Sequence, residues 1–282
     1  MKPLAEVLVR NRVSVITVAV VLIAWELLAR SLTPPLLANS AKLPTFEFIF
    51  GPALIGMADY WKLPFWAPVP DAGGEQTYIG ALLAIGYHSG ATLSRLIAGL
   101  LIGGLIGTAA GLVLSASSIA RGIMGVPLHF LRMTPLLALI PAFQFWFGVS
   151  NSAAVIFVAY GAAIPFILGT INAVTNVPRR YIESARTLGA SNWGIYRRVI
   201  LPAILPEMFS TIYVAQGLAW SAVIGAEYVG VQSGLGRVVI WADYFSNTGR
   251  MVIVAFLIAI FASLGVLVTY RLRRHFLRWT GT

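Results

Sequence analysis

Six long apolar runs constrain what this chain can fold into more than any other feature. They cover residues 13–29, 96–120, 133–149, 153–174, 208–226 and 251–270. A helix needs about 20 mostly apolar residues to cross the hydrocarbon core of a bilayer. Only 11% of the residues are charged and 58% are hydrophobic, whereas about a quarter are charged in soluble domains. The sequence therefore predicts an all-α membrane protein with about six transmembrane helices in one bundle.

The third run, residues 133–149, is short and is interrupted by Pro135 and Pro141. A broken helix at membrane depth is tolerated only where protein or a cavity surrounds it. We therefore expect this segment inside the bundle, near a pathway. The two prolines are candidate gate residues, and a simple helix kink is the alternative.

Basic residues predict the orientation, because cytoplasmic loops of membrane proteins carry an excess of Lys and Arg. With the N-terminus in the cytoplasm, the inner segments hold most of the 20 basic residues, namely Lys2, Arg10, Arg12, Arg121, Arg132, Arg179, Arg180, Arg186, Arg197, Arg198, Arg271, Arg273, Arg274 and Arg278. Six spans then place both termini in the cytoplasm (N-in/C-in).

The first third of the chain is less regular. Basic residues precede the first run, as in a signal peptide, but Glu26 and the lack of a small-residue cleavage site favour a retained span. Residues 32–77 are rich in proline and are expected to form short helices and turns, while residues 76–94 are expected to form an outer-surface helix that leads into the second span. The predicted organisation is a cytoplasmic segment and first span at 1–31, an extracytoplasmic segment at 32–90 and a core domain at 91–282.

Composition and motifs exclude several classes of function. The net charge of +10 comes from short basic clusters between apolar runs rather than from a polar module, which argues against nucleic-acid binding. Cysteine is absent and the three histidines are scattered, so no metal site is predicted. A phosphate-binding loop needs Gly-Lys-Ser/Thr, and none of Lys2, Lys42 and Lys62 follows a glycine. The spans contain no nucleophile–base pair, so we predict no catalytic residue and no cofactor bound by this chain.

The segment 178–206 joins the fourth and fifth runs and is rich in arginine. Pro178 is expected to open a short helix, and Gly189 to end it in a left-handed conformation. Ser191 or Asn192 is placed to cap a second short helix. The predicted product is a helix–turn–helix projection from the cytoplasmic face.

This segment resembles the coupling motif of ATP-binding-cassette (ABC) importer permeases, which reads Glu-Ala-Ala, three residues, Gly, nine residues, Ile-x-Leu-Pro. The matching residues are Glu183, Ser184, Ala185, Gly189, Val199, Leu201 and Pro202. Serine replaces the first alanine and valine replaces the isoleucine. The resemblance implies that this loop docks on a cytoplasmic ATPase subunit and transmits its opening and closing to the membrane helices.

A wider resemblance narrows the subfamily. Arg132 to Pro135, Pro141 and residues 145–148, followed by residues 220–227 and 234–236, are similar to nitrate/sulfonate/taurine-type permeases. That resemblance implies a type I importer bundle that works by alternating access in the bacterial inner membrane. It also implies two cytoplasmic ATPase subunits that use ATP and Mg, a second permease copy in a homodimer, and an extracytoplasmic substrate-binding protein.

The same resemblance implies a small substrate, with taurine or an alkanesulfonate as the first choice. Nitrate or bicarbonate, a heterocyclic vitamin precursor or an aromatic acid are the alternatives within this class. A secondary transporter or channel is the more distant alternative, and it is disfavoured because intramembrane charges and repeated halves are not evident. Stable copurification with an ATPase separates these classes.

A few polar residues within or near the spans are candidates for the translocation path: Gln144, Gln216 and Glu227, with Asn172 as a further polar group. Interhelical hydrogen bonding explains such residues equally well, and Glu227, near a helix end, is expected to reach water. Glycines recur every four residues at 99, 103, 107 and 111. We expect this face to pack closely against another helix.

Overall fold

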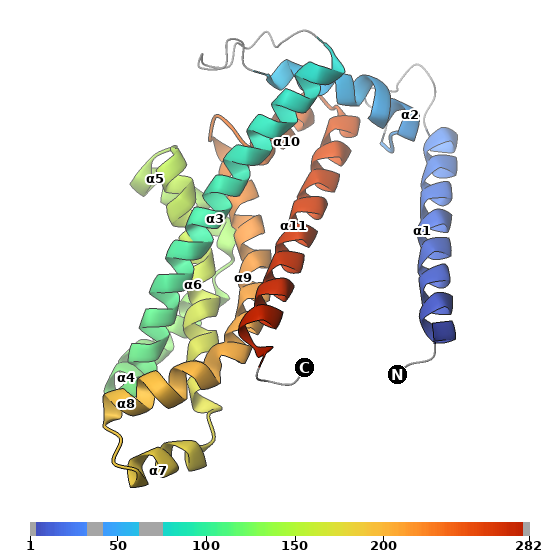
Figure 1. Cartoon of the computed structure of the whole chain (residues 1–282). Coiled ribbons are helices and arrows are strands. Elements are labelled where there is room, and N and C mark those ends of the chain that lie inside the picture. The colour runs from blue at the N-terminus through green and yellow to red at the C-terminus, as the bar shows by residue number, and fades with distance from the viewer. Residues whose placement is uncertain (1–3, 33–41, 62–75, 279–282) are drawn as a thin grey trace. The chain divides into compact units, whose positions relative to one another are not determined.

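The computed structural model describes residues 4–32, 42–61 and 76–278, and every regular element among them is helical (Figure 1). The elements in chain order are α1 (Leu4–Leu32), α2 (Phe46–Phe48), η2 (Ile49–Ala53), η3 (Gly56–Tyr60), α3 (Tyr78–Ala116), α4 (Ser118–Met133), η4 (Leu136–Leu139), α5 (Ile140–Phe147), α6 (Asn151–Thr175), α7 (Arg179–Thr187), α8 (Asn192–Ile195), η5 (Tyr196–Ile200), α9 (Leu201–Val229), α10 (Leu235–Tyr244) and α11 (Thr248–Phe276). The predicted all-α class is confirmed.

Five helices in the described part of the chain are long and apolar enough to cross a membrane. They are Val15–Leu32, Tyr78–Ala116, Asn151–Thr175, Asn192–Val229 and Thr248–Phe276. The bent pair of Ser118–Met133 and Leu136–Phe147 makes a sixth if it counts as one span. The expected number of about six spans holds on that count.

Helix α3 departs from the expected boundaries. A separate surface helix over residues 76–94 was predicted, but a single helix of 39 residues runs from Tyr78 to Ala116. Gly86 and Gly90 do not interrupt it, because a helix tolerates isolated glycines and no proline lies in this segment. At 1.5 Å per residue the helix is about 58 Å long, well beyond the roughly 30 Å of a hydrocarbon core. It ends at Ala116, and the Ser117 hydroxyl caps the next helix by accepting from the Ala120 amide at 3.2 Å.

The proline-containing third run is broken, as predicted. Helix α4 ends at Met133, η4 follows Pro135, and Pro141 lies in the first turn of α5. The two halves of the pair meet at 96°. The segment was expected inside the bundle, but within this chain most of it is exposed: Ile140 is buried, whereas Met133 is 79% and Phe145 88% exposed.

The described residues fall into two compact units, one from residues 1–87 and 238–256 and one from 88–237 and 257–282. In the first unit, the short helices between Thr45 and Trp61 were expected, while residues 62–75 lie outside the described part. Arg250 anchors these helices, because its guanidinium pairs with Asp59 at 2.5 Å and donates to the Tyr60 hydroxyl at 3.3 Å. Glu26 of α1 accepts from the Phe46 amide at 2.9 Å and pairs with Arg30 at 2.6 Å.

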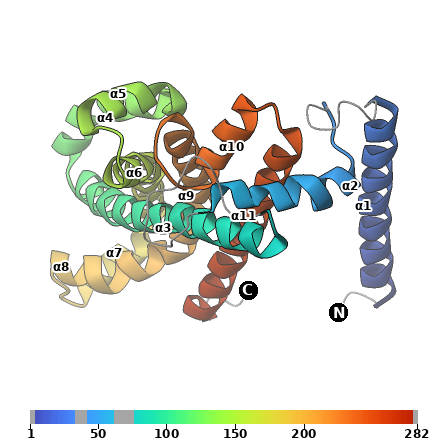
Figure 2. The same ribbon diagram turned by 90° about the horizontal axis from the view of Figure 1, so that it is seen from above.

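The second unit is built around α6 and α9, which pack closely along their lengths. Seen from above, α6 lies between α3 and the α4–α5 pair (Figure 2). The glycine face of α3 packs against α6, as predicted: a methyl group added at Gly103 would meet the Ala159 carbonyl, and one at Gly111 would meet Thr170. At Gly169 the backbone of α6 approaches Thr211 of α9 just as closely.

Candidate functional site

The predicted coupling loop, residues 178–206, has the local geometry that its sequence indicates. Helix α7 begins after Pro178 and ends at Thr187. Gly189 follows with φ +78°, in the left-handed region, where a side chain would be strained. The Ser191 hydroxyl then accepts from the Gly194 amide at 3.2 Å and caps α8. Both predicted caps are confirmed.

The second helix of the loop is not a separate element. Helix α8, the π-helical turn η5 and α9 form one continuous helix from Asn192 to Val229. Pro202 lies in the first turn of α9, directly after η5, whose widened turn accommodates a residue without an amide hydrogen. The helix is continuous but bent, because α8 lies at a steep angle to the upright part of α9 (Figure 1), and a π-helical turn and Pro206 are features that bend helices.

The loop has a packed side and an exposed side. Ile195 and Ile200 are buried in the lower core of the second unit, and Ala185, Val199 and Leu201 pack against that core. The opposite side carries exposed arginines: Arg179, Arg180, Arg186, Arg197 and Arg198. Leu188 at the tip is 87% exposed and Trp193 is 73% exposed. Figure 1 shows α7 projecting beyond the ends of α6 and α9. Glu183 and Ser184 are exposed on this projection.

The candidate path residues lie in different surroundings. Gln216 donates to Thr269 of α11 at 2.7 Å and to the Gly265 carbonyl at 3.3 Å. Gln144 lines a separate small cavity of about 20 Å³. Pro135 and Pro141 flank the break before α5, next to Leu136. The structure does not bring these residues together in one cavity, and their role in a pathway stays a prediction.

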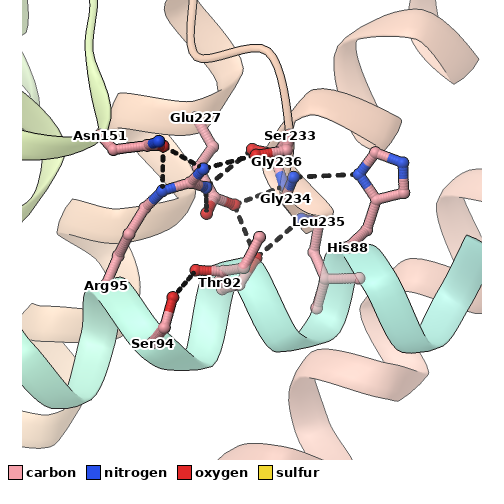
Figure 3. A network of polar contacts seen from close by, with 11 residues as sticks. His88, Thr92, Ser94, Arg95, Asn151, Glu227, Ser233, Gly234, Leu235 and Gly236 are labelled. Atoms are coloured by element: carbon pink, nitrogen blue, oxygen red, sulfur yellow. Dashed lines mark hydrogen bonds and ion pairs between the residues drawn. The ribbon is translucent and has the colours of Figure 1, made fainter. Parts of the chain in front are cut away.

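Glu227 was expected to reach water, and that expectation is wrong. Its side chain is fully buried and pairs with Arg95 of α3 at 2.5 Å (Figure 3). The Arg95 residue is only 4% exposed. Sequence reasoning missed the pair because its members are far apart in the chain, and Glu227 was assigned to a helix end that faces water.

Further polar groups complete this cluster, which we call the Arg95–Glu227 cluster (Figure 3). Arg95 also donates to Asn151 of α6 at 2.6 Å and to Ser233 at 2.6 Å. Glu227 accepts from the Thr92 hydroxyl at 2.8 Å and from the Gly236 amide at 3.0 Å.

The remaining bonds of the cluster tie the loop after α9 to α3. The Leu235 amide donates to the Thr92 hydroxyl at 2.8 Å. The Gly234 amide donates to His88 Nδ1 at 3.0 Å. Gly234 has φ +113°, and a side chain there would meet the Glu227 carboxylate. The cluster therefore holds the end of α9 and the following loop against α3, with both charges compensated.

A larger cavity lies between α6 and α9, beneath the end of α4. Its volume is about 530 Å³, within the range of roughly 300–1,000 Å³ typical of small-molecule sites. One face of α6 lines it, from Tyr160 through Ile164 and Leu168 to Asn172, and one face of α9, from Glu207 to Leu218. We call it the α6–α9 cavity.

Seven of the residues that line the α6–α9 cavity are polar. They are Arg132, Thr134, Tyr160, Asn172, Glu207, Ser210 and Thr211. The Tyr160 hydroxyl is buried without a hydrogen-bond partner in the described part of the chain. The ion pairs found among the described residues join other groups and leave Arg132 and Glu207 out. The cavity thus carries one cation and one anion that are not paired with each other.

Of these wall residues, sequence reasoning identified only Asn172 as a polar group within a span. Glu207 lies between the loop 178–206 and the run 208–226 and was not singled out, and Arg132 was used as a topology signal and as part of the subfamily resemblance. Helical spacing relates Glu207, Ser210 and Val214 on one face of α9, but that spacing does not reveal which helix faces them.

Comparisons with known proteins fit this architecture. Residues 78–281 match the family described as binding-protein-dependent transport system inner membrane component. SsuC of Escherichia coli (strain K12), which is named for aliphatic sulfonates transport, is 31% identical over 234 residues, 80% of this chain and 89% of that protein. The taurine transport system permease protein TauC of the same organism is 30% identical over 208 residues, 74% of this chain and 75% of that protein.

A solved structure supports the fold. The MetNI methionine ABC transporter, in inward-facing conformations, contains a chain that matches this one with a TM-score of 0.58 at 23% identity, over 66% of this chain and 93% of that one. The family match over residues 78–281 and the two relatives define the chain as a membrane-spanning ABC importer subunit. The chain belongs to the binding-protein-dependent transport system inner membrane component family, as a permease of the nitrate/sulfonate/taurine group.

Proposed function

We propose that this permease imports taurine or a related small sulfonate, driven by ATP hydrolysis in separate subunits. The observation that carries this proposal is the similarity to SsuC and TauC, each over about three quarters or more of both proteins. The alternatives are nitrate or bicarbonate, a heterocyclic vitamin precursor and an aromatic acid. Nitrate has support of its own from the nitrate import permease protein NrtB of Leptolyngbya laminosa, which is 32% identical over 165 residues, 58% of this chain and 59% of that protein.

The working complex would contain two copies of this chain, two cytoplasmic ATPase subunits that bind ATP and Mg, and an extracytoplasmic substrate-binding protein, in a bacterial inner membrane. The chain itself would catalyse no reaction. Its part would be alternating access, in which the substrate reaches one side of the bundle and leaves from the other. Pro135 and Pro141, at the break before α5, are proposed to act in the gate, with Gln144, Gln216 and Glu227 as further candidates.

Loop 178–206 is proposed to transmit ATPase movement to the membrane helices. An exposed apolar tip at Leu188 flanked by exposed arginines suits docking on a partner, since central apolar residues with charged surroundings are typical of protein interfaces. The helix from Asn192 to Val229, which has no break in the chain of helical turns, would pass the displacement on to the membrane.

The test is uptake of labelled taurine into vesicles that contain the complete complex, with and without ATP and the binding protein. Alkanesulfonates, nitrate, bicarbonate and a pyrimidine precursor compete in the same assay. ATP-dependent uptake that alkanesulfonates inhibit supports the proposal. Uptake that persists without any ATPase subunit would indicate a secondary transporter or channel instead. If only nitrate or heterocycles inhibited import, the protein would still be an ABC importer, but a sulfonate would not be its substrate.

Gly189 offers a test of the coupling role. Gly189→Val should lower ATP-dependent uptake at least about tenfold, because a β-branched residue at φ +78° costs on the order of 1–3 kcal/mol. Gly189→Asn is the matched control, since Asn tolerates the left-handed region, and it should retain most of the uptake. Equal uptake by both variants, with equal assembly with the ATPase, would contradict the role of this turn.

A further inference from the structure

The α6–α9 cavity differs from an anion site in one respect: its wall contains a carboxylate. Arg132 at the end of α4 and Glu207 in the second turn of α9 both line it. A simple anion would match the charge of Arg132 but not that of Glu207, which is also negative. The pair of wall charges therefore disfavours a ligand that carries negative charge alone.

The cavity wall also carries uncharged polar groups. Five further polar side chains accompany the two charges, namely Thr134, Tyr160, Asn172, Ser210 and Thr211. The Tyr160 hydroxyl adds a buried group that lacks a partner among the described residues. Buried polar groups without partners are uncommon and costly.

We infer that the α6–α9 cavity binds a small zwitterion during its passage, with Arg132 holding the acidic group and Glu207 the ammonium group. This inference rests on the proposed function and deepens it, because it selects an aminoalkanesulfonate such as taurine over alkanesulfonates and inorganic anions. A ligand with both charges satisfies both wall charges at once. A ligand that lacks the ammonium leaves Glu207 facing an anion.

The hydrogen bonds of Glu207 suggest a competing, purely structural explanation for this residue. The Asn176 amide donates to both carboxylate oxygens of Glu207, at 3.1 and 3.2 Å. Glu207 could therefore serve only to hold the end of α6 against α9. If that were its whole role, loss of the Asn176 amide would have the same effect as loss of the Glu207 charge. The two side chains thus provide a matched pair of substitutions.

The experiment measures ATP-dependent uptake of taurine and of ethanesulfonate by the reconstituted complete importer, and compares their rates. Ethanesulfonate has the same carbon chain and sulfonate but no ammonium. Because the binding protein and the ATPase are identical in all samples, a change in the ratio of the two rates reports on the permease. Glu207→Gln keeps the shape and an oxygen acceptor for Asn176 but removes the charge.

Glu207→Gln is expected to lower the taurine-to-ethanesulfonate ratio about tenfold, the effect of losing one charge-assisted hydrogen bond. Asn176→Ser should leave the ratio unchanged. Arg132→Gln should lower the uptake of both solutes, because both carry the sulfonate, and Arg132→Lys should retain most of it. Receptor-stimulated ATP hydrolysis, measured in every variant, checks that the complex is assembled.

Two results would overturn the inference while the proposed function stands. One is a wild-type importer that takes up both sulfonates but whose ratio is unchanged by Glu207→Gln. The other is an equal change of the ratio in Asn176→Ser. Absence of ATP-dependent uptake of any sulfonate by the wild-type complex would instead refute the proposed substrate, and the zwitterion site would fall with it.

Discussion

Glu227 and Glu207 lie on the same helix, α9, but in opposite kinds of surroundings. Glu227 is fully buried, paired with Arg95 and bonded to Thr92 and to the Gly236 amide. Glu207 is half-buried, lines a cavity of about 530 Å³ and has a neutral amide as its hydrogen-bond partner. The first carboxylate has every partner it needs within the chain, whereas the second faces a space that a solute could occupy.

The comparison separates two uses of charge in a membrane protein. A buried ion pair with its hydrogen bonds complete fixes the position of the segments it joins, and removing one partner leaves an uncompensated charge. A charge at the wall of a cavity contributes little to holding the fold and remains available for a ligand. Stability measurements should therefore distinguish the two sites before any substrate is known.

The largest effect is expected for Arg95→Met. It leaves the buried Glu227 carboxylate without its ion-pair partner, and such a loss costs about 3–5 kcal/mol in free energy of unfolding. Denaturant titration in mixed micelles measures it. The double variant Arg95→Met/Glu227→Met removes both charges and should recover most of the loss. A single variant within about 1 kcal/mol of the wild type would mean that the pair is hydrated in the membrane.

Gly234→Ala should have the next largest effect. The residue has φ +113°, and its added methyl group would meet the Glu227 carboxylate, so we expect a loss of about 2 kcal/mol or more. Gly217→Ala is the control within α9, because nothing lies within 4 Å of its added methyl group. That variant should be as stable as the wild type or up to about 1 kcal/mol more stable, since alanine favours the helix. An equal loss of stability in the two variants would contradict a special role of the Gly234 turn.

Glu207→Gln should change the free energy of unfolding by less than about 1 kcal/mol, because the side chain is half-buried and its amide can still accept from Asn176. The same substitution at Glu227 should cost about 3 kcal/mol or more, since Arg95 would lose its charge partner. Thermal unfolding of the two variants in one detergent gives the difference. If both were equally destabilised, Glu207 would belong to the supporting framework rather than to a binding site.

The smallest effect is expected for Tyr160→Phe. The hydroxyl that it removes is buried and has no hydrogen-bond partner in the described residues, while the ring keeps its contact with Phe143 at 5.3 Å between centroids. Stability should stay the same or rise by up to about 1 kcal/mol, because an unsatisfied buried group is lost. A clear loss of stability without substrate would show that the hydroxyl has a structural partner.

Much of the fold followed from local patterns. The apolar runs predicted the spanning helices, and the four-residue glycine spacing predicted the close contact of α3 with α6. Pro178, Gly189 and Ser191 predicted where the loop helices begin and end. These features depend on a few neighbouring residues, so propensity and capping specify them with little help from the rest of the molecule.

The wrong predictions are of two kinds: where a helix continues, and which residues far apart in the chain meet. Helix α3 runs through residues 76–94, and α8 runs through η5 into α9, because neither segment contains a feature strong enough to stop a helix once neighbours pack against it. The Arg95–Glu227 pair joins residues 132 positions apart. No local sequence pattern distinguishes a carboxylate that pairs with an arginine on another helix from a carboxylate that is exposed to water.

From the printed residues alone, the membrane-spanning class and the caps of the loop 178–206 could be derived, because hydrophobic length and glycine conformation act along the chain. Only the tertiary structure decided which acid is paired and which lines a cavity. Glu207 and Glu227 are the same residue type on one helix, and the electrostatic role of each is determined by the side chains that packing brings to it from α3, α4 and α6.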